Sequence, residues 1–483
     1  MTSRAVLKSW WPAGRGEWTL LLAGVNLMLL NFILVQHLTV ALRHEEIAVI
    51  VFSLAYFLGV SLGYFVSDRL SAGFVRAALP VCLVVQMALL VGMQALYYVV
   101  EKSAGGFAAG SVVLVVVATG VTSVPAVFLP RALAAGGGLR RSYSVEIAGS
   151  LLGLLLVPVL APIAHECVLG AYFASYLALA VTAGAGRWMT AGLALLAGVY
   201  LANFGAWDRA AAGWFDARFY GWQVDEVLLA RYTPYHKIEV VRSGRDHRLL
   251  LNGKRQFGGD PRRVYAYFVA EYPARLLGRP ATAVLGCGSM STVGRIGGFV
   301  PSVRIVDIDP EVFRASHRYF GDYNRLDELH NWTFTPDDAK HWVANTPERF
   351  GLMLHDIPPA RSRQVALTYT EEFFRLAKAR LEPDGIFSIS SLTPVSARSP
   401  YGRRVLATLD RVFEHYFVFV LRDAAYFYGG GPGLREPGVE ELRQAIDPAW
   451  RGQVRIYTRA MIKELVSEEK IITTANVGDL IYD

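Results

Sequence analysis

Apolar segments fill most of the first 204 residues, and this feature constrains the possible folds more than any other. Each segment is close to the roughly 20 residues that a helix needs to cross the hydrocarbon of a bilayer. With 53% hydrophobic and only 18% charged residues, the 483-residue chain is too apolar for a soluble enzyme. The sequence therefore predicts a multi-span α-helical membrane domain over residues 18–204, preceded by a tail at 1–17. The seven predicted spans are 18–41, 46–66, 77–100, 107–130, 144–165, 168–184 and 188–204.

Lys and Arg residues are shared unevenly between the loops of this predicted membrane domain. Cytoplasmic loops carry the excess of basic residues, so the N-terminus is predicted to be cytoplasmic, with the chain a multi-pass protein of the plasma (inner) membrane. Seven spans then favour the outside for everything after residue 204, and the side of that part is left open. The N-terminal side has the nine basic residues Arg4, Lys8, Arg15, Arg69, Arg76, Arg131, Arg140, Arg141 and Arg187, whereas the opposite side has Arg43 and Lys102.

Small and polar residues inside the spans indicate how the helices pack. Gly59–Gly63 and Gly149–Gly153 have the small-xxx-small spacing that lets two helices approach closely. Polar residues in a span can mark a transport path or can form hydrogen bonds between helices, and we favour the second interpretation. These residues are Asn26, Asn31, His37, Gln86, Gln94 and Glu146.

The composition changes after the last span. Residues 205–230 are rich in Trp, Phe and Tyr with interspersed charges, which is typical of an interfacial linker at headgroup level. Residues 231–280 alternate like a β-hairpin unit, with Gly-containing turns, and end in a helix. Strands and helices then alternate, which predicts a mostly parallel, doubly wound, Rossmann-like α/β domain over 281–483.

The start of this α/β domain has the pattern of a nucleoside site. The apolar run 282–285 leads into Gly286 and Gly288, a helix follows, and the β-prone run 303–306 ends at Asp307. Glycines let the backbone approach a ligand, and a carboxylate about 20 residues on accepts hydrogen bonds from ribose hydroxyls. The alternative is a tight turn with an ordinary strand-end aspartate.

Two further aspartates follow predicted strands of the same sheet. Asp338 comes after the strand at 332–335, and Asp356 closes the strand at 351–356. Ligands of open α/β sheets bind at the carboxyl ends of the strands, so Gly286, Asp307, Asp338 and Asp356 are expected to share one site.

Several motifs make the second half of the chain resemble the spermidine synthase (polyamine aminopropyltransferase) family. They are YHKIEVV with His236, LLLNGKRQF with Gln256, IVDIDPEV with Asp307, DDAKHWV with Asp338, and LTYTEEFF at 367–374. The span YSVEIAGSLLGLLLVPVLAP is similar to one in the membrane-fused branch of that family. The resemblance implies a class I methyltransferase/spermidine synthase type of fold and, as donor substrate, S-adenosylmethionine or decarboxylated S-adenosylmethionine. The nucleoside-binding residues that it implies are His236, Gln256, Gly286, Gly288, Ser289, Asp307 and Asp338.

Three acidic positions of that family are missing. Ser289 stands where the family has the aspartate that holds the donor's ammonium, and Pro359 stands where it has the second aspartate after the fourth strand. The acidic acceptor motif appears only as Tyr265-Ala266-Tyr267. A site without these counter-ions is expected to bind a polyamine cation poorly. Ser289 favours intact S-adenosylmethionine as the donor, because no aspartate at this position repels the donor's carboxylate.

Proton transfer at such a site is expected to involve Asp356, Tyr265 and Tyr369, whereas His355 fits a buried strand-end histidine. Three function classes stay open: a membrane-anchored enzyme that transfers an alkyl, aminopropyl or methyl group, an inactive nucleoside-binding or regulatory domain, and a transporter or scaffold. The expected partners are the lipid bilayer and a small-molecule nucleoside, with no nucleic acid and with a homo-oligomer left open. No metal is expected, since Cys82, Cys167 and Cys287 lie far apart.

Overall fold

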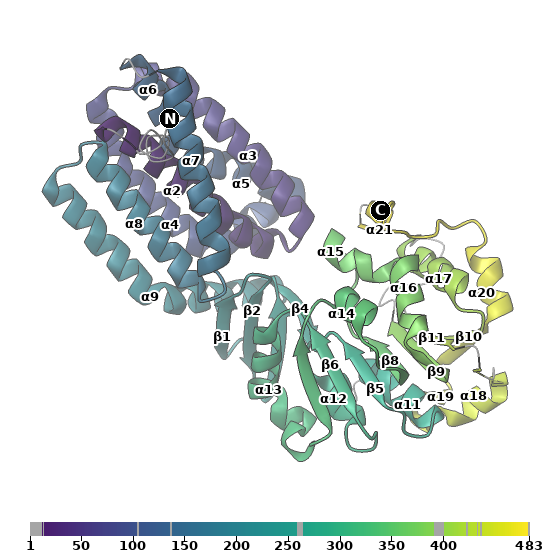
Figure 1. Cartoon of the computed structure of the whole chain (residues 1–483). Coiled ribbons are helices and arrows are strands. Elements are labelled where there is room, and N and C mark those ends of the chain that lie inside the picture. Colours follow the sequence, from purple (N-terminus) through teal and green to yellow (C-terminus); the bar gives the residue numbers. More distant parts are fainter. Residues whose placement is uncertain are drawn as a thin grey trace. The chain divides into compact units, whose positions relative to one another are not determined.

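The structure is a computed structural model of the chain, which describes residues 12, 14–103, 106–135, 138–257, 264–390, 400–421, 424–431, 433–434 and 437–481. The chain forms two compact units, residues 1–255 (unit 1) and 256–483 (unit 2). Unit 1 contains long helices and the first strands, and unit 2 contains the larger sheet and its helices (Figure 1).

Helices cover all seven segments predicted as spans. Six of these helices, in the described part of the chain, are long and apolar enough to cross a bilayer, and α8 is not among the six. Their bounds are α2 (Arg15–Leu42), α3 (Glu45–Val66), α4 (Ala72–Ser103), α5 (Phe107–Ala126), α7 (Leu139–Leu160), α8 (His165–Thr182) and α9 (Arg187–Phe219). The short η1 (Ser67–Arg69) follows α3, and α6 (Phe128–Ala134) follows α5.

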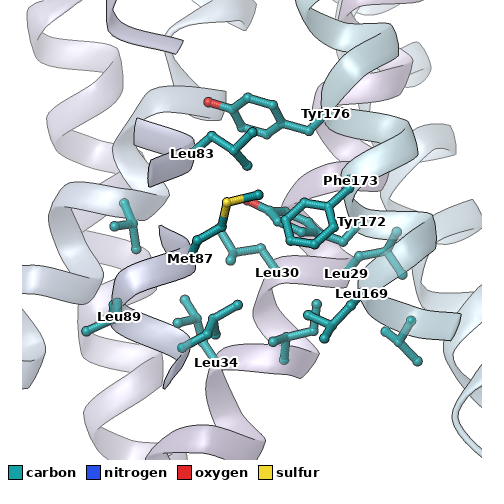
Figure 2. Close-up of a cluster of buried hydrophobic side chains, with 14 of the residues drawn as sticks. Leu29, Leu30, Leu34, Leu83, Met87, Leu89, Leu169, Tyr172, Phe173 and Tyr176 are labelled. Atoms are coloured by element: carbon teal, nitrogen blue, oxygen red, sulfur yellow. The ribbon is translucent and has the colours of Figure 1, made fainter. Parts of the chain in front are cut away.

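The core of unit 1 lies between α2, α4 and α8. Figure 2 shows its side chains, among them Leu29, Leu30, Leu34, Leu83, Met87, Leu89, Leu169, Tyr172, Phe173 and Tyr176. Polar groups in this core join neighbouring helices. The side-chain amide of Asn26 donates to the carbonyl oxygen of Tyr172 (3.2 Å), and that of Gln86 donates to the carbonyl oxygen of Val121 (3.2 Å). For these two residues the predicted hydrogen bonds between helices are confirmed.

Glycines set the closest helix contacts, as their spacing predicts. A Cβ atom at Gly149 of α7 would lie 2.0 Å from the carbonyl oxygen of Leu21 in α2, and one at Gly153 would lie 2.7 Å from that of Val25. A Cβ atom at Gly59 of α3 would lie 1.9 Å from the hydroxyl of Thr122 in α5. Only glycine lets these backbones approach so closely.

Basic residues gather at one end of the bundle, which we call the arginine end. Arg15 donates to the carbonyl oxygen of Thr182 (2.8 Å), where α8 ends. Arg131 donates to the carbonyl oxygen of Leu70 (2.7 Å), and Arg141 pairs with Glu17 (2.8 Å). Cationic side chains at helix C-termini satisfy carbonyl groups that have no partner within the helix.

A four-stranded sheet lies at the opposite end of the bundle, the sheet end. Its strands, in the order β1-β2-β3-β4, are β1 (Glu226–Tyr232), β2 (Lys237–Ser243), β3 (Asp246–Leu251) and β4 (Lys254–Phe257). Gln36, near the end of α2, donates to the carbonyl oxygen of Thr233 (2.9 Å), and Asn252 donates to Glu45 at the start of α3 (3.1 Å). The predicted β-hairpin unit is present, and all but its last residues belong to unit 1.

The helix α9 differs from the sequence prediction because it continues to Phe219 through much of the predicted linker at 205–230. Asp208, Ala212, Phe215 and Asp216 are buried on one side of this extension. Their spacing is that of one helix face, so packing, together with several alanines, extends the helix beyond its apolar part.

Unit 2 is built on an eight-stranded sheet with the order β12-β10-β11-β9-β8-β5-β6-β7. Its parallel half contains β5 (Thr282–Leu285), β6 (Val303–Asp307), β7 (Trp332–Pro336), β8 (Phe350–His355) and β9 (Leu381–Ser390). The antiparallel half contains β10 (Tyr416–Leu421), β11 (Ala424–Gly430) and β12 (Val454–Thr458). The parallel half agrees with the predicted Rossmann-like fold, and the antiparallel half was not predicted.

Helices connect the strands of unit 2. Before β5 lie α10 (Val264–Ala266), the π-helical η2 (Tyr267–Glu271) and α11 (Tyr272–Leu276). Between the parallel strands lie α12 (Ser291–Ile296), α13 (Pro310–Asn324), η3 (Leu326–Glu328), α14 (Ala339–Asn345), α15 (Arg363–Ala366), η4 (Leu367–Tyr369) and α16 (Glu371–Ala379). The rest are α17 (Pro400–Val412), α18 (Val439–Ala445), α19 (Pro448–Arg451), α20 (Arg459–Val466) and α21 (Gly478–Ile481). The chain crosses from β7 to β8 on the other side of β5, which places a topological switch point beside β5.

Candidate functional site

The turn after β5 brings two parts of unit 2 into close contact. Gly286 has a φ of +87°, and a Cβ atom there would lie 2.5 Å from the carbonyl oxygen of Asp356. Gly288 has a φ of +42°, and a Cβ atom there would meet nothing within 4 Å. Because it has no side chain, Gly286 lets the ends of β5 and β8 approach each other. Gly288 leaves open space beside the turn.

Asp307, at the end of β6, ties this turn to the next strand. Its Oδ2 accepts a hydrogen bond from the backbone N–H of Cys287 (2.8 Å), and its Oδ1 accepts one from that of Asp309 (2.9 Å). Two backbone donors therefore hold the carboxylate, which has acceptor capacity for further hydroxyl groups. This position beside the glycine turn is the one that the sequence predicts for ribose binding.

Asp356 accepts hydrogen bonds from hydroxyl groups of two other elements. Tyr265 of α10 donates to its Oδ1 (2.8 Å), and Thr292 of α12 donates to its Oδ2 (2.7 Å). Burial raises the pKa of Asp356 to about 7, although the hydrogen bonds from Thr292 and Tyr265 lower it, and the nearby Asp307 raises it further. A carboxyl group with such a pKa is available as a general base near neutral pH.

Thr292 is a contact that the sequence analysis missed. It lies in the first turn of α12, where helical side chains point back toward the N-terminus and hence toward the strand ends. Its place in the sequence, a residue with a hydroxyl group one helical turn after the glycines, could have identified it as a site residue. The partner Tyr265 was predicted, and it lies just before the π-helical turn η2, an irregularity that often occurs at functional sites.

Tyr369 and His355 are buried behind this site. The hydroxyl of Tyr369 donates to the carbonyl oxygens of Ile357 (3.1 Å) and Pro358 (3.0 Å), so it holds the loop that follows Asp356. Nε2 of His355 lies 3.1 Å from the carbonyl oxygen of Thr368, and burial lowers the pKa of this histidine to about 4. His355 is therefore neutral at physiological pH, as expected for a core histidine, and the catalytic role of Tyr369 stays a prediction.

Asp338 and Ser289 already have local structural contacts. Asp338 caps α14, because its Oδ1 accepts from the backbone N–H groups of Lys340 (2.9 Å) and His341 (3.0 Å). Ser289 is buried in the turn after β5, and its carbonyl oxygen accepts a hydrogen bond from Asn324 (2.7 Å). Their contacts with a nucleoside stay predictions.

The two remaining predicted residues precede the large sheet. His236 is half-buried just before β2 in unit 1. Gln256 lies in β4 and is the first residue of unit 2. The contacts within each unit do not test whether these two residues bind a nucleoside, so this role stays a prediction.

Comparison with known proteins identifies the type of domain that carries this site. Residues 289–425 match the family model of the spermine/spermidine synthase domain. The polyamine aminopropyltransferase of Leptospira interrogans is 32% identical over 196 residues, which are 38% of this chain and 39% of that protein. Polyamine aminopropyltransferase 2 of Aquifex aeolicus is 26% identical over 201 residues, which are 40% of each protein. The match thus spans about two fifths of the length of these relatives.

Among solved structures, a spermidine synthase in complex with the transition state analogue AdoDATO covers 51% of this chain. The alignment includes 90% of that synthase, with 14% sequence identity and a TM-score of 0.42.

Proposed function

Because the C-terminal part of this chain contains a spermine/spermidine synthase domain, we propose that it binds an S-adenosyl nucleoside and transfers an alkyl group of the aminopropyl type to a nucleophilic acceptor. The observation that carries this proposal is the position of Asp356. This carboxyl group, with a pKa of about 7, follows β8, next to the glycine turn that Asp307 holds. A proton acceptor beside a nucleoside site is what group transfer to an amine requires.

In this mechanism the turn after β5 leaves room for the nucleoside, and Asp307 accepts hydrogen bonds from its ribose hydroxyls. The nucleophile of the acceptor attacks the carbon next to the sulfonium. The carbon–sulfur bond breaks, its electron pair stays on sulfur, and a thioether nucleoside leaves. Asp356 takes the proton that the acceptor loses, while Tyr265 and Thr292 fix both of its carboxyl oxygens.

The donor is either S-adenosylmethionine or its decarboxylated form. The names of the relatives support the decarboxylated, aminopropyl donor. The serine at position 289, in place of an ammonium-binding aspartate, supports a donor that keeps its carboxylate. The affinities of the full-length protein for the two compounds, measured side by side, decide which one is the donor.

Asp307→Ala is expected to weaken binding of either donor about 10-fold or more. The variant loses a charge-assisted hydrogen bond worth about 1.5–3 kcal/mol. Isothermal calorimetry on the full chain in detergent measures this, and Asp322→Ala, which removes an exposed aspartate of α13, is the matched control. Equal affinity of wild type and Asp307→Ala would remove Asp307 from the site. Donor binding by the wild type without any product would favour a nucleoside-binding or regulatory domain.

We also propose that unit 1 anchors the protein in a lipid bilayer. The outward faces of its helices are apolar, with exposed Ile50, Leu54, Phe57, Leu58, Leu62 and Phe65 on α3 and Leu151, Leu152, Leu154, Leu155 and Val159 on α7. Apolar surface of this extent is unfavourable in water and is usual for a helix that faces lipid.

The arginine end and the sheet end support an orientation for this anchor. With basic loops in the cytoplasm, the four-stranded sheet would lie outside. A cysteine replacing the exposed Arg245, between β2 and β3, is then expected to react with a membrane-impermeant maleimide in intact spheroplasts, in a background without native cysteines. Gly186→Cys, an exposed position at the arginine end, is the control that reacts only after permeabilisation. S-adenosyl donors are made in the cytoplasm, so an outside location would require an external supply of donor for group transfer. The reverse pattern would place the sheet in the cytoplasm and remove this requirement.

A further inference from the structure

A buried lysine is the centre of a charge cluster in unit 1. The side chain of Lys237, the first residue of β2, has no solvent exposure. Its Nζ lies 2.9 Å from Oδ1 of Asp208 in α9 and 3.0 Å from Oε1 of Glu239. Despite burial, these two carboxylates raise the pKa of Lys237 well above its ordinary value. The ammonium is therefore charged, and its two anionic partners already exceed it by one charge.

Asp216 adds a third carboxyl group to this cluster, because it lies within reach of the charges of Glu239 and Lys237. It lies two helical turns after Asp208 on α9 and is fully buried, with 0% exposure. Neither of its carboxyl oxygens has a hydrogen-bond partner in the described part of the chain; the same holds for Glu239, but Glu239 has the ion pair with Lys237, whereas no ion pair of Asp216 occurs among the described residues. An ionised carboxylate in that position would be very unfavourable, because a buried charge needs a partner. The ammonium of Lys237 is already engaged by Asp208 and Glu239.

Other ionisable groups at the sheet end supply no compensating positive charge. The guanidinium of Arg43 lies over the ring of Phe219, 3.4 Å from its centroid, and the hydroxyl of Tyr220 donates to the carbonyl oxygen of Gly253 (2.5 Å). No ion pair of Arg43 with Asp216 occurs among the contacts of the described residues. The phenol ring of Tyr232 lies 5.2 Å from Nζ of Lys237 and is neutral.

The histidines at this end are neutral as well, because their hydrogen bonds form one directed chain. The amide of Gln36 donates to Thr233, so its oxygen faces Nδ1 of His165 (3.1 Å) and must accept from it. Nε2 of His165 then accepts from Nε2 of His37 (3.3 Å), and Nδ1 of His37 accepts from the hydroxyl of Tyr232 (3.2 Å). A second proton on His165 would place two N–H groups face to face, and one on His37 would break the hydrogen bond that its Nδ1 accepts from Tyr232.

We propose that Asp216 is a proton-binding site of unit 1, which carries a proton at neutral pH while Asp208 and Glu239 stay ionised around Lys237. The ligand is a proton and not a metal cation, because the ammonium of Lys237 already occupies the position between the two other carboxylates. Loss of this proton at alkaline pH would place two buried negative charges, on Asp216 and Glu239, in one region between α9 and β2. The joint between the helix bundle and the small sheet would then loosen.

Infrared spectroscopy of the full-length protein in lipid vesicles tests the proposal through the carbonyl stretch of a protonated carboxyl group. The difference between the spectra of the wild type and Asp216→Asn, which cancels other protonated carboxyl groups such as Asp356, is expected to show this band at neutral pH and to lose it on alkalinisation. Glu239→Gln should keep the band and lose it at lower pH than the wild type, because the neighbouring negative charge is gone, whereas Glu226→Gln, an exposed control on β1, should change nothing.

A second measurement follows the joint itself by hydrogen exchange. After correction for the intrinsic, base-catalysed exchange rate, the protection of β2 is expected to fall at alkaline pH in the wild type and to stay constant in Asp216→Asn. A band that survives in Asp216→Asn and disappears in Glu239→Gln would place the proton on Glu239 and overturn the proposal. Loss of the band on adding sodium or potassium ions at constant pH would equally overturn it, because a metal cation would then occupy the site.

Discussion

Asp356→Asn is expected to lower the rate of group transfer by roughly 10²- to 10⁴-fold, the usual contribution of a positioned general base. The amide keeps the shape of the carboxyl group and can still bond to Tyr265 and Thr292, but it cannot take the proton of the acceptor. Release of the thioether nucleoside from decarboxylated S-adenosylmethionine measures the rate; because the site lacks the counter-ions for a polyamine, the acceptors tested are monoamines as well as putrescine. The wild-type rate should rise with pH through about 7, where Asp356 becomes ionised. Tyr265→Phe, which keeps the carboxylate, should lose much less activity, and an unchanged rate in Asp356→Asn would exclude this base.

The same variant has an expected effect on stability that does not depend on the acceptor. The folded state raises the pKa of Asp356 from 3.8 to about 7, so it binds the proton more tightly than the unfolded state does. The stability that this tighter proton binding gives to the folded state is fully present below about pH 3.8 and is lost as the pH rises through about 7. Above that pH, Asp356→Asn should therefore be more stable than the wild type by up to roughly 2–4 kcal/mol. Hydrogen exchange of β5 and β8 measures the difference, and Asp384→Asn, at an exposed position, should show none.

Gly149→Leu is expected to prevent the assembly of the helix bundle. Its Cβ atom alone would lie 2.0 Å from the carbonyl oxygen of Leu21, so α2 and α7 would have to separate. Overpacking against backbone, which cannot move aside as a side chain can, should cost about 3 kcal/mol or more. The yield of monodisperse protein after detergent extraction and its thermal midpoint measure the loss. Gly198→Leu in α9, where a Cβ atom meets nothing within 4 Å, is the matched control. Normal stability of Gly149→Leu would contradict the packing of α2 against α7.

Features with a local sequence signal were predicted well. Hydrophobic runs determine where helices form, so all seven segments predicted as spans coincide with helices. Glycine spacing predicted a close helix contact at Gly149, although not that α2 is the partner. In the α/β unit, the alternation of strands and helices predicted the parallel half of the sheet, and therefore that Asp307 and Asp356 end strands at one edge.

Features that depend on distant residues were not predictable in the same way. Thr292 and Asp356 are 64 positions apart, and no periodicity connects a hydroxyl in one helix with the carboxyl group of a remote strand end. The ion pair of Lys237 with Asp208 arises only because β2 packs on the extension of α9. The antiparallel strands β10 and β12 have no sequence motif. β10 pairs with β11, and β12 pairs with β10, and these partners come from other parts of the sheet.

The ion pair between Lys237 and Asp208 also determines where this protein can be divided. A truncated protein beginning at residue 231, where the composition becomes that of a soluble domain, would keep Lys237 and Glu239 but lose Asp208 and Asp216 with the rest of α9. The face of the small sheet that α9 covers would become solvent-exposed, and the lysine would lose the partner with the shorter contact. Fragments that contain unit 2 alone should therefore begin close to the unit boundary at residue 256 and leave β1 to β3 with unit 1.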